Sequence, residues 1–90
     1  RLTLSGGQDR GDIANFRFGR EGQHLLAVEC KNRTQLSLPA WVSEAQVEAK
    51  NYEAIAGIVI HKRKGKGQAA DQFVTLTLAD FLTILRAAAS

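Results

Sequence analysis

Hydrophobic and polar residues alternate at the start of the chain, in Arg1–Ser5 (RLTLS), with the two-residue period of a half-buried β-strand. Two further runs favour strands, Asp12–Phe18 (DIANFRF) and Gln23–Lys31 (QHLLAVECK). The segment Gly19–Gly22 (GREG) separates them, and a short glycine-bounded loop of this kind is typical of a β-hairpin. We therefore expect these two strands to be antiparallel neighbours.

The middle of the chain changes to a helical period. After Leu38-Pro39 a run without glycine carries apolar residues at three- and four-residue steps, and proline is tolerated in a first helical turn. The spacing predicts an amphipathic helix of about four turns that ends near Gly57. The apolar residues of this run, with Trp41 and Tyr52 expected in the core, are Trp41, Val42, Ala45, Ala49 and Tyr52.

The last third of the chain predicts two strands and a second helix. Gly57–His61 (GIVIH) is apolar and β-branched like a buried strand, and Phe73–Leu78 (FVTLTL) alternates again. Thr77 and Asp80 have the spacing of a capping box before a helix over Phe81–Ala89. The order of elements is therefore β-β-β-α-β-β-α. It predicts a single α/β domain, a mixed sheet of about five strands flanked by helices.

Composition narrows the class of protein without changing this fold. The 90 residues are 44% hydrophobic and 23% charged, which is an ordinary globular balance. Cys30 is the only cysteine, so internal disulfides and cysteine-based zinc cages are excluded and a reducing compartment is expected. Apolar stretches such as Ala54–Ile60 are far shorter than a membrane span, and no signal peptide opens the chain. We expect a cytoplasmic protein, and an excerpted sequence because the chain has no methionine to start it.

The positive charge is concentrated in one short segment. The chain has 12 basic and 9 acidic residues, and four of the basic ones lie in His61–Lys66 (HKRKGK) with no acid. Without that segment 8 basic residues remain against 9 acidic ones, so the rest of the chain is slightly acidic. The segment predicts contact with a polyanion such as a nucleic-acid backbone, and a solvated loop is the alternative. The residues expected to bind nucleic acid are Arg10, Arg33, Lys62, Arg63, Lys64 and Lys66.

The predicted hairpin also brings acidic residues together. If its loop is centred between Arg20 and Glu21, Asp12 lies directly opposite Glu29, where like charges destabilise a sheet. Lys31 shares the face of Glu29, while Cys30 points to the other face. A hard divalent cation such as Mg²⁺ would remove the repulsion, and the neighbouring ammonium could orient a water that attacks a phosphodiester. This arrangement predicts nuclease chemistry.

Two short motifs carry a resemblance to a known family. Gly11-Asp12-Ile13-Ala14, followed by Val28-Glu29-Cys30-Lys31, resembles the PD-(D/E)XK nuclease superfamily, with Gly11 in the place of the usual proline. The order of a G-D-I strand, an E-x-K strand and a helix-strand unit is most similar to the Holliday-junction resolvase branch and related phage or bacterial nucleases. The resemblance covers roughly Leu2 to Ile60.

The resemblance implies a restriction-endonuclease-like fold and a set of residue roles. Mg²⁺, or Mn²⁺ in its place, would be held by Asp12, Glu29 and the backbone carbonyl of Cys30. Lys31 would place the attacking water, and the cut would leave 5′-phosphate and 3′-hydroxyl ends. Gln46 stands where family members often carry a glutamine near the active site, although a partly solvated helix-edge residue is the alternative. Many members also have an acidic residue on a preceding helix, which here either lies upstream of Arg1 or is missing.

These observations together predict a metal-dependent DNA endonuclease, structure-selective like a Holliday-junction resolvase, in a bacterial or phage-infected cell. We expect a homodimer, because two symmetric cuts suit a two-fold pair and a domain this small gains stability by pairing. Cys30 is expected to be structural, and His24 and His61 to lie at the surface. Two alternatives remain: a non-catalytic nucleic-acid-binding module of the same fold, and a protein-interaction domain whose basic loop binds an acidic partner.

Overall fold

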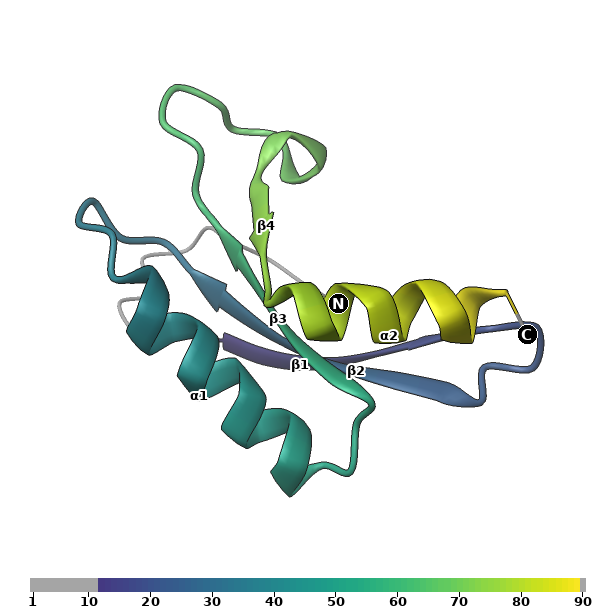
Figure 1. Cartoon of the computed structure of the whole chain (residues 1–90). Helices are drawn as coiled ribbons and strands as arrows, with labels where there is room; N and C mark the ends of the chain where they lie inside the picture. The colour runs from purple at the N-terminus through teal and green to yellow at the C-terminus, as the bar shows by residue number, and fades with distance from the viewer. Residues whose placement is uncertain (1–11, 90) are drawn as a thin grey trace.

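The computed structural model describes residues 12–89, and residues 12–15 by their backbone only. The described residues form two α-helices that pack against one sheet (Figure 1). The elements are β1 (Asp12–Phe18), β2 (His24–Lys31), α1 (Leu38–Asn51), β3 (Ala56–His61), a 3-10 turn (Ala69–Asp71), β4 (Phe73–Thr75) and α2 (Leu78–Ala88). None of the helices in the described range is long and apolar enough to cross a membrane.

The sheet is mixed, as the sequence predicts. Its strand order is β1-β2-β3-β4, with β1 and β4 antiparallel to their neighbours and the central pair β2 and β3 parallel. Helix α1 is the crossover between the two parallel strands, because such strands cannot be joined by a tight turn. The α/β class is confirmed. Residues 12–89 form four strands rather than five, and the strand predicted at Arg1–Ser5 lies outside the described residues.

The two helices cover opposite faces of the sheet (Figure 1). On the α1 face, Trp41 and Ala45 pack against Val59 of β3 in a buried cluster. On the α2 face, Ile84 packs against a second cluster formed by residues of β2 and β3, which are Leu26, Val28, Cys30 and Ala56. Alternation along β2 therefore sends its even-numbered side chains toward α2 and its odd-numbered ones toward α1.

Gly57 allows α1 to lie directly on β3. A Cβ atom at this position would overlap the carbonyl oxygen of Ala45 in α1, so only glycine lets the two backbones approach this closely. The prediction that Trp41 belongs to the core is confirmed, since the residue is 4% exposed. The same prediction for Tyr52 is wrong: α1 ends at Asn51, and Tyr52 is 47% exposed as the residue that caps the helix.

The last helix begins earlier than the sequence predicts, and the strand before it is shorter than the predicted Phe73–Leu78. β4 covers only Phe73–Thr75, and α2 begins at Leu78 directly after Thr77. The Thr77 side chain accepts a hydrogen bond from the Asp80 N–H at 3.1 Å, which confirms the predicted N-cap. The Asp80 carboxylate accepts a hydrogen bond from the Gly57 N–H at 3.2 Å. β4 is short and pairs only with Val59–His61, so it does not reach Gly57. Asp80 at the start of α2 therefore accepts the hydrogen bond of this backbone N–H in place of a strand.

The register of the first hairpin differs from the predicted one by one residue. Asp12 pairs with Cys30 and Ile13 with Glu29, so the expected direct opposition of Asp12 and Glu29 is wrong. The cause is a five-residue loop, Gly19–Gln23, in place of the four-residue loop expected. Gln23 belongs to the turn because its side-chain oxygen accepts a hydrogen bond from the backbone N–H of Glu21 at 3.0 Å. Adding one residue to the loop moves every partner along the ladder by one.

Candidate active site

Two charged side chains are buried at the end of β2, on the face covered by α1. Glu29 and Lys31 are each 7% exposed, and they point to the same side because they are two residues apart on a strand. Charged residues are seldom buried unless they are paired. The Lys31 ammonium lies 3.6 Å from Oε1 of Glu29, so the E-x-K motif forms an ion pair inside the protein.

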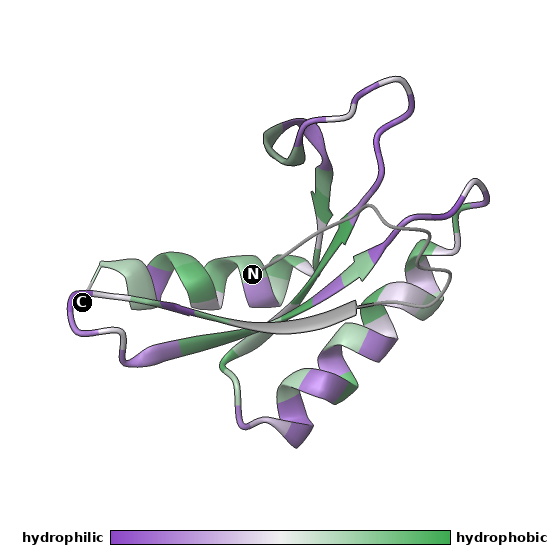
Figure 2. Ribbon diagram, turned by 180° about the vertical axis from the view of Figure 1, so that it is seen from behind, coloured by the Kyte–Doolittle hydropathy of each residue, from purple (hydrophilic) through white to green (hydrophobic). Residues whose placement is uncertain are grey.

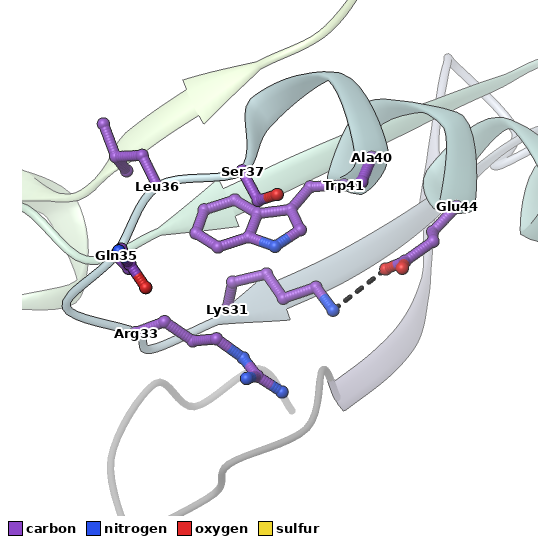
Figure 3. Close-up of a pocket in the computed structure, with 8 residues that line it drawn as sticks. All are labelled: Lys31, Arg33, Gln35, Leu36, Ser37, Ala40, Trp41 and Glu44. Carbon is purple, nitrogen blue, oxygen red and sulfur yellow. Dashed lines mark ion pairs between the residues drawn. The ribbon is translucent and has the colours of Figure 1, made fainter.

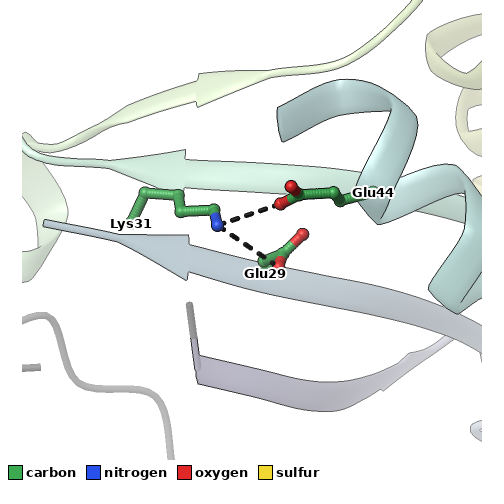
Figure 4. Close-up of polar contacts among 3 residues, drawn as sticks. All are labelled: Glu29, Lys31 and Glu44. Atoms are coloured by element: carbon green, nitrogen blue, oxygen red, sulfur yellow. Dashed lines mark ion pairs between the residues drawn. The ribbon is translucent and has the colours of Figure 1, made fainter. Parts of the chain in front are cut away.

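Helix α1 adds a second carboxylate to this pair. Oε1 of Glu44 lies 2.9 Å from the Lys31 ammonium, and the Glu44 side chain is 51% exposed. Figure 4 shows Lys31 between the two carboxylates, with Glu44 reaching down from the helix toward the strand. The lysine is therefore held by a buried acid on its own strand and by a half-exposed acid on the neighbouring helix.

The surroundings of Glu29 disfavour its negative charge. Burial raises the pKa of Glu29, and the negative charges of Glu44 and Glu48 act in the same direction, while Lys31 opposes them. The Oε2 atom of Glu29 is buried and has no hydrogen-bond partner among the described residues. A buried oxygen of this kind, on a carboxylate, is an acceptor that a cation or a donor from a bound molecule would satisfy.

The cluster opens into a cleft of about 480 Å³ at the start of α1. Figure 3 shows its lining: Lys31 reaches along the cleft toward Glu44, and the Trp41 ring forms one wall. The Lys31 ammonium lies 5.9 Å from the centre of the Trp41 ring, within the range of a cation–π contact. Arg33, from the loop after β2, also lines the cleft. The lining of the cleft therefore carries two cations beside one carboxylate, Glu44, while Glu29 lies buried behind Lys31.

The residues present suit Mg²⁺ with oxygen ligands. No group of three or more His, Cys, Asp or Glu side chains gathers into a metal cluster within the described residues. Mg²⁺ does not require such a cage, because it commonly binds through one or two carboxylates, several waters and substrate phosphate oxygens. Glu29, with its unpartnered Oε2, and the half-exposed Glu44 are carboxylates of the required kind.

The other predicted site residues are placed differently. The side chain of Asp12 and the whole of Arg10 lie outside what the structure describes. Cys30 is 3% exposed in the core on the α2 face, the structural position that the sequence indicates. Gln46 is exposed and lines a shallow cleft together with Lys50 and Asp80. The residue of α1 that forms an ion pair with Lys31 is Glu44 instead.

Glu44 is the residue that sequence reasoning missed. It lies three residues after Trp41, so helical spacing places both on neighbouring parts of one face. That spacing could have indicated that Glu44 lies near Lys31, because a short loop joins the E-x-K strand to α1 and the helix then runs back across that strand.

The predicted nucleic-acid-binding residues of the described chain lie at one end of the sheet. Arg33 follows β2, and the segment Lys62–Lys66 follows β3, and parallel strands end at the same edge. The expected surface position of His61 is wrong: it is 4% exposed, because it is still the last residue of β3. Its Nε2 atom lies 2.7 Å from the Thr75 hydroxyl, and the pKa of His61 is lowered by burial.

Comparison of the chain with protein-family models, with curated proteins and with solved structures finds no match.

Proposed function

We propose that this chain is a metal-dependent endodeoxyribonuclease with a restriction-endonuclease-like fold. The observation that carries the proposal is the buried Glu29–Lys31 pair: the lysine lines a cleft, and one oxygen of the glutamate has no partner among the described residues. Folding alone gives no reason to bury these charges, since apolar residues of similar volume would stabilise a core at least as well. A site that must handle a phosphodiester and a cation gives such a reason.

Each residue of the cluster has a role in phosphodiester hydrolysis. The Lys31 ammonium holds the attacking water and the phosphate oxygens, and Glu44 keeps that ammonium in place. The water oxygen bonds to phosphorus while the bond from phosphorus to the 3′ oxygen breaks; the attacking water gives up a proton to solvent, and the leaving 3′ oxygen takes one up from solvent. The products are a 5′-phosphate and a 3′-hydroxyl.

The proposed cofactor is Mg²⁺, with Mn²⁺ able to replace it. Glu29 and the second carboxylate, Glu44, would hold it, together with the Cys30 carbonyl and Asp12 that the family resemblance adds. When bound, such a cation acts as a Lewis acid that stabilises the charge developing on the phosphate oxygens. The unpartnered Oε2 of Glu29 supports this assignment.

The proposed substrate is DNA, bound through its backbone and selected by its shape. Arg33 at the mouth of the cleft and the basic segment 62–66 supply sequence-independent attraction to phosphates. The proposed preference for branched DNA, as in Holliday-junction resolvases, rests on the family resemblance.

We infer a homodimer that pairs through α2. A two-fold pair suits symmetric cutting of two strands. Figure 2 colours α2 largely as hydrophobic, although it is an outer layer of the molecule. Four of its apolar residues are at least 37% exposed, at spacings that keep them on one side of the helix: Leu78, Phe81, Leu82 and Leu85. Sedimentation of the wild type and of Leu85→Glu tests this, with dimer dissociation expected in the variant.

The test of the nuclease is cleavage of labelled four-way-junction, duplex and single-stranded DNA with Mg²⁺, Mn²⁺ or EDTA. Metal-dependent cutting is expected in the wild type, and loss of cutting in Glu29→Ala and in Lys31→Ala. Matched controls are Glu21→Ala in the hairpin loop and Lys50→Ala on the exposed side of α1, which should both cut normally.

Two outcomes contradict the proposal in different ways. Tight, salt-sensitive DNA binding without cutting would identify the non-catalytic module of the same fold. Neither binding nor cutting would favour the protein-interaction domain.

A further inference from the structure

A second cleft lies beside the candidate active site, between the loop after β2 and the loop after β3. Its volume is about 560 Å³, within the range of roughly 300–1,000 Å³ found for small-molecule sites. Arg33, Leu36, Lys62, Lys64 and Phe73 line it, and the buried His61 also contributes. The roles proposed so far for the site at Lys31 make no use of this space.

The cleft is suited to an anion that also carries an apolar surface. Within the described part of the chain, the charged residues that line it are all basic. Leu36 and Phe73 are 63% and 50% exposed, so the cleft offers apolar surface beside three cations. A nucleotide combines both features, with a phosphate for the cations and a flat base for the apolar side chains.

Phe73 is held in a fixed position by its neighbours. Its ring centre lies 5.6 Å from that of His61, which in turn lies 5.7 Å from the ring of Trp41. The guanidinium of Arg63 lies 5.7 Å from the Phe73 ring. The half-exposed ring therefore has a supported orientation, and the nearby guanidinium adds to its attraction for a stacked base.

The basic loop is also held in shape. The side-chain oxygen of Gln72 accepts a hydrogen bond from the Arg63 N–H at 2.7 Å. Its amide nitrogen donates to the carbonyls of Lys66 and Gln68, at 3.1 and 2.6 Å. One side chain thus fixes three points of the loop, which lowers the entropic cost of binding a ligand there.

The two clefts adjoin at the loop after β2, since Arg33 and Leu36 line both. A strand whose phosphate lies at Lys31 has its next nucleotide close to the second cleft. From this we propose that the second cleft binds one unpaired base of the strand being cut, stacked on Phe73 with its phosphates on Arg33, Lys62 and Lys64. The inference rests on the proposed nuclease function and adds that the enzyme requires an unstacked nucleotide beside the cut.

Binding of fluorescein-labelled oligothymidylate, measured by anisotropy with Ca²⁺ in place of Mg²⁺, tests the inference. Phe73→Ala should weaken binding roughly tenfold, while Phe73→Trp should retain it. The matched control is Val74→Ala, because Val74 is similarly exposed at 53% on the same strand but does not line the cleft. Thermal unfolding of each variant shows whether it is folded.

A ligand-side test avoids any effect on folding. The wild type should bind an abasic strand of the same length roughly tenfold more weakly than oligothymidylate, and Phe73→Ala should not distinguish the two. Equal binding of both strands by the wild type, with cutting intact, would overturn the base-binding cleft and leave the nuclease standing. A wild type that neither binds nor cuts DNA would overturn both.

Discussion

The ammonium of Lys31 on β2 lies 2.9 Å from a carboxylate oxygen of Glu44 on α1, an ion pair that joins the sheet to the helix at the candidate site. Glu44 is half exposed, so solvent screens the pair and its contribution to stability is small. Its effect is positional instead. The Lys31 ammonium lies nearer to Glu44, at 2.9 Å, than to the buried Glu29, at 3.6 Å, and Glu44 holds it in the lining of the cleft.

The first prediction concerns this positional role. Glu44→Gln should lower kcat roughly tenfold to a hundredfold, because a misplaced Lys31 no longer aligns the attacking water. The pH profile provides a second readout. The charge of Glu44 raises the pKa of Glu29, so removing it should move the acidic limb of the profile to lower pH. Glu21→Gln is the control, and an unchanged profile in Glu44→Gln would contradict the role assigned to it.

The second prediction follows from the raised pKa of Glu29. A folded state that holds a proton more tightly than the unfolded state loses stability as pH rises from the ordinary value of 4.5 through the raised pKa. Glu29→Gln removes this loss. It should raise the denaturation midpoint of the metal-free protein at neutral pH, with little effect below pH 4.5, and should abolish cleavage. Urea titrations of the wild type and the variant at acidic and neutral pH measure the difference.

The reverse result would be informative. If Glu29→Gln destabilised the protein at neutral pH, the ion pair with Lys31 would outweigh the burial cost of Glu29. The buried Glu29–Lys31 ion pair would then be explained by its contribution to folding stability.

The strand and helix types are readable from the sequence because they depend on local periods. The β-rich run that ends at Lys31 and the helical spacing from Trp41 both match the structure. The pairing register of β1 and β2 could not be predicted from the sequence, because it depends on whether Gln23 belongs to the strand or to the turn. A single hydrogen bond, from the Glu21 N–H to the Gln23 side chain, accompanies the five-residue loop and shifts the pairing of Asp12 from Glu29 to Cys30.

Only part of the candidate site could be predicted from the sequence, for a similar reason. Glu29 and Lys31 are two residues apart on one strand, so their proximity follows from local geometry. Glu44 comes near them only because α1 crosses back over β2, and the crossing angle depends on packing. The close contact at Gly57 contributes to that packing through its fit against Ala45, which no single-sequence pattern indicates.

The third prediction tests that contact. Gly57→Ala should destabilise the domain by about 2 kcal/mol or more, since its Cβ overlaps the backbone of α1 rather than a movable side chain. Gly67→Ala is a matched control, because a Cβ there meets nothing within 4 Å. Chemical denaturation of both variants gives the comparison. Equal stability of the two would mean that α1 can move away from β3 without cost.

The fourth prediction concerns His61, which lies between the rings of Trp41 and Phe73. Burial lowers its pKa below the ordinary value of 6.5, so the unfolded chain takes up a proton that the folded one resists. Stability should therefore fall as pH drops from 6.5 toward the lowered pKa. His61→Gln should remove that part of the pH dependence, while His24→Gln in the first hairpin should retain it.

The measurement for His61 is the denaturation midpoint between pH 7 and pH 5, taken as a difference between each variant and the wild type. Because Glu29 changes stability with the opposite sign at acidic pH, only the difference isolates the histidine. A His61 that titrated normally would leave the wild type and His61→Gln parallel. If the fall in stability between pH 7 and pH 5 is lost in His61→Gln and kept in His24→Gln, the lowered pKa belongs to His61. The His61 ring is then neutral at neutral pH, and the three rings beside the second cleft, Trp41, His61 and Phe73, carry no charge there.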